Sequence, residues 1–565
     1  MQGSNLFSWD LIKSLKKLAV IGAVEAGLAV ALALQIKSVL NSKPSGQTGS
    51  TVSDHTMLTS GGILLLIVLV SGFLKWRERV EAERLGQNYV HKIRLGLFDH
   101  LSRLSFRVLA RKRKGPLLLR FMNDLTALRQ WVTIGLSRLV ISLIITITGL
   151  SALFFINTDI AIALTVLFFL GGVCAFLLGR SVNLSVRNAR KRRSILASGI
   201  TEKMLTMPSI QVLARRQKER RDFQIKSGKL KTAMGERASF IGLLRGLTRV
   251  VGSLAIVITV FIGALGLQSG QINTGELLAA IALVTFLSPA LYDLGRVYEY
   301  WHGAQIAQEK INNLLKLGPT ILSPPKGQRA RLGRFDLNFK SVSYAPALKD
   351  INVRTVPSDK IALFGANGAG KSTLLHLVMR LDDPDDGEIR LGGKSIDRYG
   401  IGSLRRAVTL VSSDAPLFKG TVESNLCYPN DQINIDTGKQ FLLDLGLDID
   451  NRKSVFWRGR AIREGGANLS KGEISAILIA RAFLMQPKIL LLDEIDVHLD
   501  KKMKAAFYRA LDAYKGTVIA ASHDPAILSL CNKVWHLQEG EIENLTPSHF
   551  KSTLHKLNIT QAETG

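Results

Sequence analysis

Cysteine is scarce in this sequence: Cys174, Cys427 and Cys531 are the three among 565 residues, and they lie far apart. A disulfide framework or a cysteine-based metal cluster needs closely patterned cysteines, so this scarcity excludes both. Residues 1–17 also lack the small-residue cleavage site of a secretory signal, and the first apolar run begins near residue 18. We therefore expect neither a cleaved leader nor an additional domain ahead of that run.

Charged residues are nearly absent from six long runs in the first three hundred residues, although the chain carries 74 basic and 45 acidic side chains. Each run approaches the roughly 20 residues that cross a bilayer. Buried helices of a large soluble protein rarely reach this length with so few charges. We therefore predict six transmembrane helices surrounded by a lipid bilayer. Their expected spans are about 18–40, 57–76, 131–156, 159–179, 241–268 and 275–298.

Basic residues are in turn missing from short connections between these spans. The turns at 157–159 and 269–274 have none, whereas 75–130 carries 14 Lys or Arg and 180–240 carries 16. Basic loops stay on the cytoplasmic side, so we expect both termini and the C-terminal domain in the cytoplasm and the spans in the inner (cytoplasmic) membrane. The net charge of +29 then reflects membrane topology, and no nucleic-acid partner is expected. A soluble DNA-handling protein is the alternative that this charge suggests, and the six apolar runs argue against it.

The pattern changes along the chain and predicts two domains. The long basic segments keep helical spacing, so the membrane helices should continue beyond the bilayer within an all-α transmembrane domain at 1–316. The Pro- and Gly-rich stretch 317–333 indicates a linker. Alternating strands and helices then predict an α/β domain at 334–545, before a C-terminal tail at 546–565. The expected fold class is a multidomain membrane protein with a six-helix domain followed by an α/β domain.

The α/β domain contains "GANGAGKST", which fits the pattern G-x-x-x-x-G-K-[ST] and lies between the apolar strand "KIALF" and the helix "STLLHLVMRL". A glycine-rich turn that arose by chance would need neither the strand before it nor the helix after it. Glycine lets backbone amides approach phosphate, the lysine adds a point charge, and the serine can ligate Mg²⁺. The sequence therefore predicts a P-loop for ATP and Mg²⁺, formed by Gly365, Ala366, Asn367, Gly368, Ala369, Gly370, Lys371, Ser372 and Thr373.

Two further strands end in residues that suit the same chemistry. "KILLLDEID" predicts a buried parallel strand that ends at Asp493 and Glu494. Beside a P-loop, Asp493 is placed to hold Mg²⁺ and Glu494 to orient or deprotonate an attacking water. "GTVIAASHD" predicts a second buried strand, which ends at His523. Because ligands bind at the carboxyl ends of parallel strands, we expect His523 in the same crevice, although a lone histidine there is more often structural.

The stretch "NLSKGE" places a lysine in an unusual position. Ser470, followed by Glu473 ahead of an apolar run, predicts a capping box at the start of a helix. Lys471 then lies in the first turn, where the helix dipole disfavours a cation. A phosphate facing this helix end would offset that cost. The alternative is a solvated lysine beside an ordinary helix cap.

The order of these motifs resembles that of ABC transporters: the P-loop is followed by "VTLVSSDAPLFKGTVESNL", "LSKGE", "ILLLDE", "VHLD" and "SHD". The first half resembles the membrane domain of type IV ABC exporters, in which 115–129 and 202–223 match the two coupling segments. The resemblance covers about residues 10–545. It implies a half-transporter that pairs with a second half-transporter chain, and ATP hydrolysis with Glu494 and His523 as catalytic residues. It also implies that ATP on one chain is capped by the signature of the other, through Ser470, Lys471, Gly472, Glu473 and Asp500.

Four positions depart from the family pattern. Lys471 replaces the first glycine of the usual LSGGQ signature, and Glu473 replaces its glutamine. Ser413 stands where the family has a glutamine beside Mg²⁺. Tyr344 is the nearest candidate for stacking on adenine, although Pro346 competes for the aligned position. The expected metal ligands are therefore Ser372, Asp493 and Ser413.

The function that these patterns favour is ATP-driven export of an unidentified substrate, such as a lipid, a peptide or a drug-like molecule. Two alternatives remain: a nucleotide-regulated channel or regulator with weak hydrolysis, which the altered signature suggests, and an importer on an exporter scaffold. A homodimer is favoured over a heterodimer, because symmetric closed pairs are the commonest oligomers.

Glu25 lies inside the first span, where a carboxylate is costly, so we expect it to line a cavity or to pair with Arg138 or Arg249.

Overall fold

The computed structural model divides the chain into two compact units. One, the helical unit, comprises Met1–Ser102 and Ala110–Leu317, and the other, the sheet unit, comprises Arg103–Leu109 and Gly318–Gly565. The structure describes residues 9–41, 54–110, 112, 117, 120–318, 321–324, 335–428, 434–447 and 461–550. Most of the predicted linker and the tail beyond residue 550 therefore lie outside the described residues. The two units meet at Leu317 and Gly318, and the assignment of Arg103–Leu109 to the sheet unit was not foreseen from the sequence.

Among the residues that the structure describes, six helices of the helical unit are long and apolar enough to cross a membrane, as predicted. Several far exceed the roughly 20 residues that a bilayer requires, since α2 has 50 residues and α9 has 53, so the helices do continue beyond the spans. Shorter helices and π-turns connect or extend them. The elements are α1 (Trp9–Asn41), α2 (Asp54–Arg103), α3 (Phe106–Ala110), η1 (Arg120–Asp124), α5 (Leu125–Gln130), η2 (Trp131–Leu136), α6 (Ser137–Ile156), α7 (Thr158–Leu205), α8 (Met207–Val212), α9 (Arg216–Gln268) and α10 (Thr274–Leu315).

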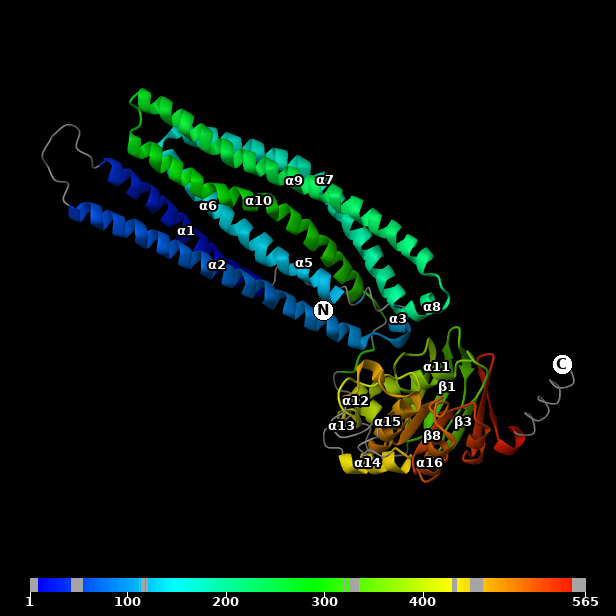
Figure 1. Cartoon of the computed structure of the whole chain (residues 1–565). Helices are drawn as coiled ribbons and strands as arrows, with labels where there is room; N and C mark the ends of the chain where they lie inside the picture. Colours follow the sequence, from blue (N-terminus) through cyan, green and yellow to red (C-terminus); the bar gives the residue numbers. More distant parts are fainter. Residues whose placement is uncertain are drawn as a thin grey trace. The chain divides into compact units, whose positions relative to one another are not determined.

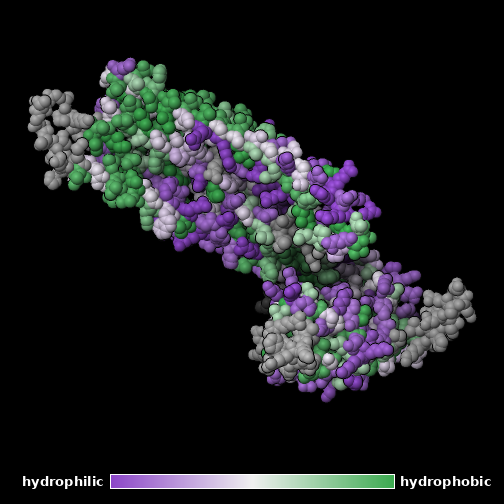
Figure 2. Space-filling view, viewed as in Figure 1, coloured by the Kyte–Doolittle hydropathy of each residue, from purple (hydrophilic) through white to green (hydrophobic). Residues whose placement is uncertain are grey.

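Side chains in the short turns cap the helices that follow them. Asn157 caps α7 by accepting a hydrogen bond from the Ile160 amide at 2.9 Å, and Asn273 forms a capping box with Glu276 at the start of α10. The long helices then pack lengthwise, α7 against α9 and α1 against both α6 and α10 (Figure 1). Figure 2 shows that apolar surface covers the end of the helical unit at which α9 joins α10, whereas polar surface covers much of its remainder. This distribution matches membrane spans that continue into water.

The buried carboxylate of the first span has a partner that the sequence did not identify. Glu25, with 2% of its surface exposed, forms an ion pair with Lys75 of α2 at 2.7 Å. The expected partners are engaged elsewhere: Arg138 pairs with Asp293, and the Arg249 guanidinium lies 5.5 Å from the centroid of the Tyr292 ring. The prediction of an Arg138 or Arg249 partner was therefore wrong, because the cation comes from a neighbouring helix whose register sequence alone does not provide.

Two sheets form the sheet unit. The larger has the order β10-β9-β3-β8-β7-β6, in which β9, β3, β8, β7 and β6 are parallel, and the smaller has the order β2-β1-β4-β5. All five residues of β7 and of β8 are buried, as expected for central parallel strands that helices cover on both faces. The strands are β1 (Leu337–Tyr344), β2 (Leu348–Ile351), β3 (Lys360–Phe364), β4 (Asp386–Leu391), β5 (Lys394–Ser395), β6 (Val408–Ser412), β7 (Ile489–Asp493), β8 (Thr517–Ala521), β9 (Lys533–Gln538) and β10 (Glu541–Leu545).

The helices of this unit follow the strands in the alternating order that the sequence predicted. They are α11 (Lys371–Val378), α12 (Ile401–Ala407), α13 (Val422–Cys427), α14 (Ile435–Asp444), α15 (Lys471–Leu484) and α16 (Lys501–Asp512), with short 3₁₀ turns η3 (Ile396–Arg398), η4 (Glu464–Gly466) and η5 (Pro525–Ser529). The last described residue, Phe550, is 3% exposed and its ring packs against Phe364 of β3. The packed domain therefore extends a few residues past the predicted end at 545.

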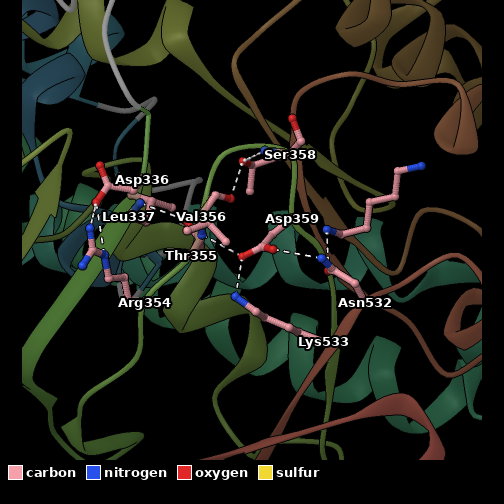
Figure 3. Close-up of polar contacts among 11 residues, drawn as sticks. Asp336, Leu337, Arg354, Thr355, Val356, Ser358, Asp359, Asn532 and Lys533 are labelled. Carbon is pink, nitrogen blue, oxygen red and sulfur yellow. Dashed lines mark hydrogen bonds and ion pairs between the residues drawn. The ribbon is translucent and has the colours of Figure 1, made fainter.

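A buried carboxylate joins the amino ends of the central strands. Asp359, 2% exposed, accepts hydrogen bonds from the Val356 amide at 2.7 Å and the Asn532 side chain at 2.9 Å, and its other partner is Lys533 at 2.7 Å (Figure 3). Asn532 in turn accepts from the Lys360 amide at 3.0 Å. These contacts fix the start of β3 relative to β9, and so they fix the opposite end of β3, where the P-loop begins.

Candidate functional site

The P-loop residues lie at the carboxyl end of β3, beside the carboxyl ends of β8 and β7. In the parallel register Leu363 lies opposite Ala521, and Ala521 lies opposite Asp493. Two glycines allow the backbone of the loop to turn tightly and to pack closely against neighbouring backbone. A Cβ on Gly365 would be 2.5 Å from the Leu537 carbonyl oxygen, and Gly370 has a φ of +111°, which side chains other than glycine rarely adopt. The predicted glycine-rich loop is thus formed by close backbone packing.

Lys371 folds over this loop. Its Nζ donates to the carbonyl oxygens of Gly365 at 2.8 Å and Ala366 at 3.3 Å, and only 5% of the residue is exposed. The same Nζ lies 3.4 Å from His523 Nε2 and 3.8 Å from Glu494 Oε1. The Lys371 ammonium group therefore lies close to residues at the carboxyl ends of three strands, β3, β7 and β8.

Ser372 and Asp493, two predicted metal ligands, are in direct contact. The Ser372 hydroxyl donates to Asp493 Oδ1 at 3.0 Å. Burial raises the pKa of the Asp493 carboxyl, and the hydrogen bond from Ser372 opposes that shift. Adjacent hydroxyl and carboxylate oxygens suit Mg²⁺, and a cation would offset the cost of a buried carboxylate. Among the described residues, no group of three His, Cys, Asp or Glu side chains could hold a metal ion.

Ser413 lies beside this pair through its backbone. It follows β6, and its amide donates to the Asp493 carbonyl oxygen at 3.2 Å. The structure therefore places Ser413 next to the expected metal position, while a role for its shorter hydroxyl in place of the family's glutamine stays a prediction.

Glu494 and His523 face one another. Glu494 Oε1 lies 3.3 Å from His523 Nε2, and about a third of the Glu494 side chain is exposed. Glu494 has a φ of +51°, and its amide donates to the Ala521 carbonyl oxygen at 2.9 Å. A left-handed conformation in a residue other than glycine is costly, and such strain concentrates at functional sites. The turn directs the carboxylate toward the P-loop lysine, where a water-orienting base would be required.

The signature residues form the capping box that the sequence predicted. Ser470 Oγ accepts from the Glu473 amide at 3.2 Å, and Glu473 Oε2 accepts from the Ser470 amide at 2.7 Å. Lys471 is exposed in the first turn of α15, and a Cβ on Gly472 would be 2.9 Å from the His498 carbonyl oxygen. Asp500 caps α16, accepting from the Met503 amide at 2.8 Å. Within the described part of the chain, no hydrogen bond or ion pair joins Ser470–Glu473 to the P-loop.

Tyr344, the predicted adenine platform, lies in the core of the smaller sheet. It is 7% exposed, and the guanidinium of Arg107 lies 4.3 Å from its ring centroid. Burial raises the pKa of this phenol to about 12. Little of the ring is left for stacking on adenine, because the residue occupies an inward-facing strand position that the short "SYAPAL" turn did not reveal.

Arg107 belongs to the segment Arg103–Leu109, whose contacts with the rest of the sheet unit the sequence did not predict. Its amide donates to both carboxylate oxygens of Asp382 at 3.1 Å. Its guanidinium pairs with Asp385 at 3.0 Å and donates to the Ala345 carbonyl oxygen. In the sequence, the aspartate-rich run "LDDPDD" after the P-loop helix could have indicated that a basic residue binds there. The expected coupling segment 115–129 belongs to the helical unit, and its role in coupling stays a prediction.

His376 lies between this docked segment and the expected metal ligands Ser372 and Asp493. The Phe106 ring packs against the His376 ring with centroids 4.5 Å apart, and the Phe106 amide donates to Leu381 at 2.9 Å. His376 lies on α11, one helical turn beyond Ser372. Burial lowers the pKa of His376, and the nearby Asp493 carboxylate opposes that shift. His376 therefore contacts the docked segment through Phe106 and also lies close enough to Asp493 for the two side chains to interact electrostatically.

The helical unit contains a cavity of about 510 Å³ among α1, α2, α6 and α10. Its wall is largely apolar and includes Ile141, Ile145 and Phe286. Two basic side chains, Lys75 and Arg138, and two acidic ones, Glu78 and Asp293, also line it. A cavity of this size and composition can accommodate a drug-sized amphipathic molecule.

Comparisons with known proteins agree with this architecture. The family model for the ABC transporter transmembrane region matches residues 18–291, and that for the ABC transporter matches residues 348–496, so together they cover about three quarters of the chain. A protein of Staphylococcus aureus strain NCTC 8325, provisionally named a multidrug export ATP-binding/permease protein, is 24% identical over 542 residues, which are 93% of this chain and 92% of that protein. A counterpart from the bovine S. aureus strain RF122 is 23% identical over the same coverage.

Solved structures contain the same fold. A bacterial Atm1-family ABC exporter with ATP bound matches 95% of this chain and 96% of its own, with a TM-score of 0.82 and 19% sequence identity. At this identity the match shows the fold alone. It extends over both units, each of which agrees with the fold class that the sequence predicted.

Proposed function

The chain belongs to the ABC transporter family, as an exporter-type half-transporter with a membrane domain fused to an ATPase domain, and on this premise we propose that two such chains form an ATP-driven exporter. The observation that carries the proposal is the convergence of Lys371, Ser372, Asp493, Glu494 and His523 at one edge of the sheet. ATP hydrolysis is the chemistry for which this set of groups is suited.

Each residue of the set has a distinct role in the proposed reaction. The amides of the P-loop and the Lys371 ammonium bind the phosphates, and Lys371 exchanges its loop carbonyls for phosphate oxygens. Mg²⁺, when bound, neutralises phosphate charge, and Ser372 and Asp493 would hold it. Glu494 orients and deprotonates the attacking water, and His523, 3.3 Å away, positions the Glu494 carboxylate.

A second chain is needed to complete the site. The signature turn Ser470–Glu473 makes its capping-box hydrogen bonds within α15, and the remaining amides at that helix N-terminus suit a phosphate held by a partner. We favour a homodimer, with the alternative that a partner half-transporter supplies a regular signature. In the homodimer Lys471 faces every hydrolysing site, whereas in the heterodimer it faces only the weaker one.

The membrane cavity supports a substrate with both apolar and charged parts. Its apolar wall would bind a hydrophobic body, while the ion pairs that line it, Lys75 with Glu78 and Arg138 with Asp293, would face a polar part of the substrate. The excess of basic residues in 75–130 and 180–240 supports an orientation with the ATPase domain in the cytoplasm of the inner membrane. A lipid, a peptide or a drug-like molecule would fit these requirements.

The decisive experiment is Glu494→Gln in the purified protein in nanodiscs, with Glu541→Gln as a control that removes an exposed carboxylate of β10. We expect ATP binding to be retained and hydrolysis to fall by about 100-fold or more, because a positioned base contributes roughly 10²–10⁴-fold. The control should hydrolyse ATP at the parent rate. Unchanged hydrolysis in Glu494→Gln would refute the proposed base.

A second candidate function, a channel or regulator with weak hydrolysis, is favoured by Lys471 and Ser413. Lys471→Gly tests it together with the pairing mode, and Lys471→Gln separates lost charge from added backbone freedom. In a homodimeric exporter both variants should shift turnover or nucleotide affinity by about fivefold or more, as a charge-assisted phosphate contact of roughly 1 kcal/mol implies. Parent rates in both variants of a chain that is active alone would refute the phosphate-facing role.

A further inference from the structure

A second cavity of about 360 Å³ lies in the helical unit, away from the membrane cavity described above. Its walls come from the η1–α5 segment, α7, α9 and α10. Among the described residues, the basic side chains that line it outnumber the acidic ones by five to one. The basic residues are Arg120, Arg190, Arg193, Arg237 and Lys310, and the acidic residue is Asp124. We call this cavity the basic pocket.

The carboxylates near the basic pocket do not balance its positive charge. Asp124, which is 7% exposed, lies 3.0 Å from Arg120 and 3.9 Å from Lys310. Arg237 pairs with Glu299 at 2.7 Å. Within the described part of the chain, no carboxylate lies within ion-pair distance of Arg190 or Arg193. At least two guanidinium groups at the cavity therefore have no ion-pair partner among these residues.

One donor in the basic pocket is buried without a partner. The Nε of Arg237 is buried and, among the described residues, makes no hydrogen bond, although Nη2 of the same group bonds to Glu299. Arg190 uses Nη1 to donate to the Gly303 carbonyl oxygen at 2.7 Å, which holds its guanidinium at the cavity wall. An unmade hydrogen bond from a charged group is costly, so an anionic acceptor in the pocket would be stabilising.

The position of the basic pocket along the helices places it beyond the hydrocarbon of a bilayer. Arg190 lies 32 residues along α7 from Thr158, or about 48 Å at 1.5 Å per residue. Arg237 lies 31 residues along α9 from its end at Gln268, or about 46 Å. The hydrocarbon core is about 30 Å thick, and about 40–45 Å with the headgroups. A ligand would therefore enter the pocket from water or from the adjacent headgroup layer.

We propose that the basic pocket is a binding site for a small phosphate-bearing anion, separate from the nucleotide site. The planar forks of several arginines match the tetrahedral oxygens of phosphate and bind it bidentately. A cavity of about 360 Å³ accommodates a small ligand or a lipid headgroup, but not a macromolecule. The phosphate belongs either to a soluble metabolite or to the headgroup of an anionic lipid, and both sources present the same chemistry to these arginines.

The test uses the full-length protein in nanodiscs, with the nucleotide site saturated by a Mg²⁺-bound non-hydrolysable ATP analogue. One arm titrates glycerol 3-phosphate into nanodiscs of phosphatidylcholine, and the other replaces part of the phosphatidylcholine by phosphatidic acid. Calorimetry measures the first arm, and native mass spectrometry of retained lipid measures the second. Binding in the first arm identifies a soluble anion, and binding in the second alone identifies a lipid headgroup. The absence of binding in both arms would overturn the proposal.

A pair of double variants separates the pocket from general basic charge. Arg190→Gln with Arg193→Gln removes two cations of the pocket, whereas Lys191→Gln with Arg192→Gln removes two neighbouring cations of the same helix that do not line it. We expect the pocket variant to bind at least about tenfold more weakly and the control to bind within about twofold of the parent. Equal weakening in the two double variants, or none in either, would refute the site. Should the pocket variant fail to fold, Arg193→Gln alone provides the same test, because this side chain is exposed.

Discussion

Removal of the Arg107 side chain should release the segment Arg103–Leu109 from the sheet unit. The segment is held by few contacts, and Arg107 provides most of the polar ones. Its side chain makes an ion pair with Asp385, a cation–π contact with Tyr344 and a hydrogen bond to the Ala345 carbonyl oxygen. Arg107→Ala removes all of these contacts and leaves the backbone bond to Asp382 in place.

The magnitude follows from the exposure of each contact. The ion pair is partly solvated, with 30% of the Arg107 side chain and 44% of that of Asp385 exposed, so it contributes about 0.5 kcal/mol. The cation–π contact adds about 1 kcal/mol and the hydrogen bond about 0.5–1 kcal/mol. Together they amount to about 2 kcal/mol, which corresponds to roughly a 30-fold shift toward the released segment. Asp385→Asn should account for only about twofold of this shift, because it removes the charge of the ion pair, while the amide oxygen of the new side chain can still accept the hydrogen bond that the Ala345 amide donates to Asp385 at 2.8 Å.

Hydrogen exchange measured by mass spectrometry reports the release directly. The amides of Phe106 and Arg107 donate to Leu381 and Asp382, so their exchange follows the opening of the segment. We expect their exchange in Arg107→Ala to accelerate by about 30-fold in the full protein in nanodiscs, while Arg103→Ala, which truncates an exposed arginine, leaves it unchanged. Parent-like protection in Arg107→Ala would show that Phe106 and the backbone hold the segment without the arginine.

Four further outcomes are expected. Asp493→Asn should abolish Mg²⁺-dependent hydrolysis and raise the melting temperature of the nucleotide-free protein at pH 7. Burial raises the pKa of the Asp493 carboxyl, so folding stability falls as the pH rises from the ordinary pKa of an aspartate to the raised pKa. An unchanged or lower melting temperature would contradict this expectation. Asp359→Ala should cost the sheet unit about 3 kcal/mol in chemical denaturation, because Lys533 and Asn532 lose their buried partner, and a loss below about 1 kcal/mol would count against the network. Ser470→Ala should destabilise the start of α15 by about 1 kcal/mol, seen as faster amide exchange at Glu473, and equal protection would show that the cap is not needed. Glu25→Gln should lower the melting temperature through loss of the Lys75 pair, and a change confined to the ratio of substrate-stimulated to basal ATPase activity would instead place Glu25 in the substrate path.

The sequence alone determined the parts of the protein that depend on local pattern. Six charge-poor runs specify membrane helices because hydrocarbon excludes charge and unpaired backbone groups, and the structure has six such helices. The P-loop was predictable because its glycines, lysine and serine are contiguous and lie between a strand and a helix. The capping box at Ser470 and Glu473 was predictable for the same reason, since a cap spans only one turn.

Only the tertiary structure decided which distant residues meet. Glu25 pairs with Lys75 because the register of α1 against α2 brings them together, and no local pattern encodes that register. Tyr344 is buried beneath Arg107 because a segment more than 200 residues earlier docks on the smaller sheet. The basic pocket likewise exists only where α7, α9 and α10 converge, since its arginines look like ordinary solvated charges along the chain. Charge patterns in a sequence give the number of cations and the side of the membrane on which they lie, whereas helix packing determines which of them share a cavity and have no ion-pair partner there.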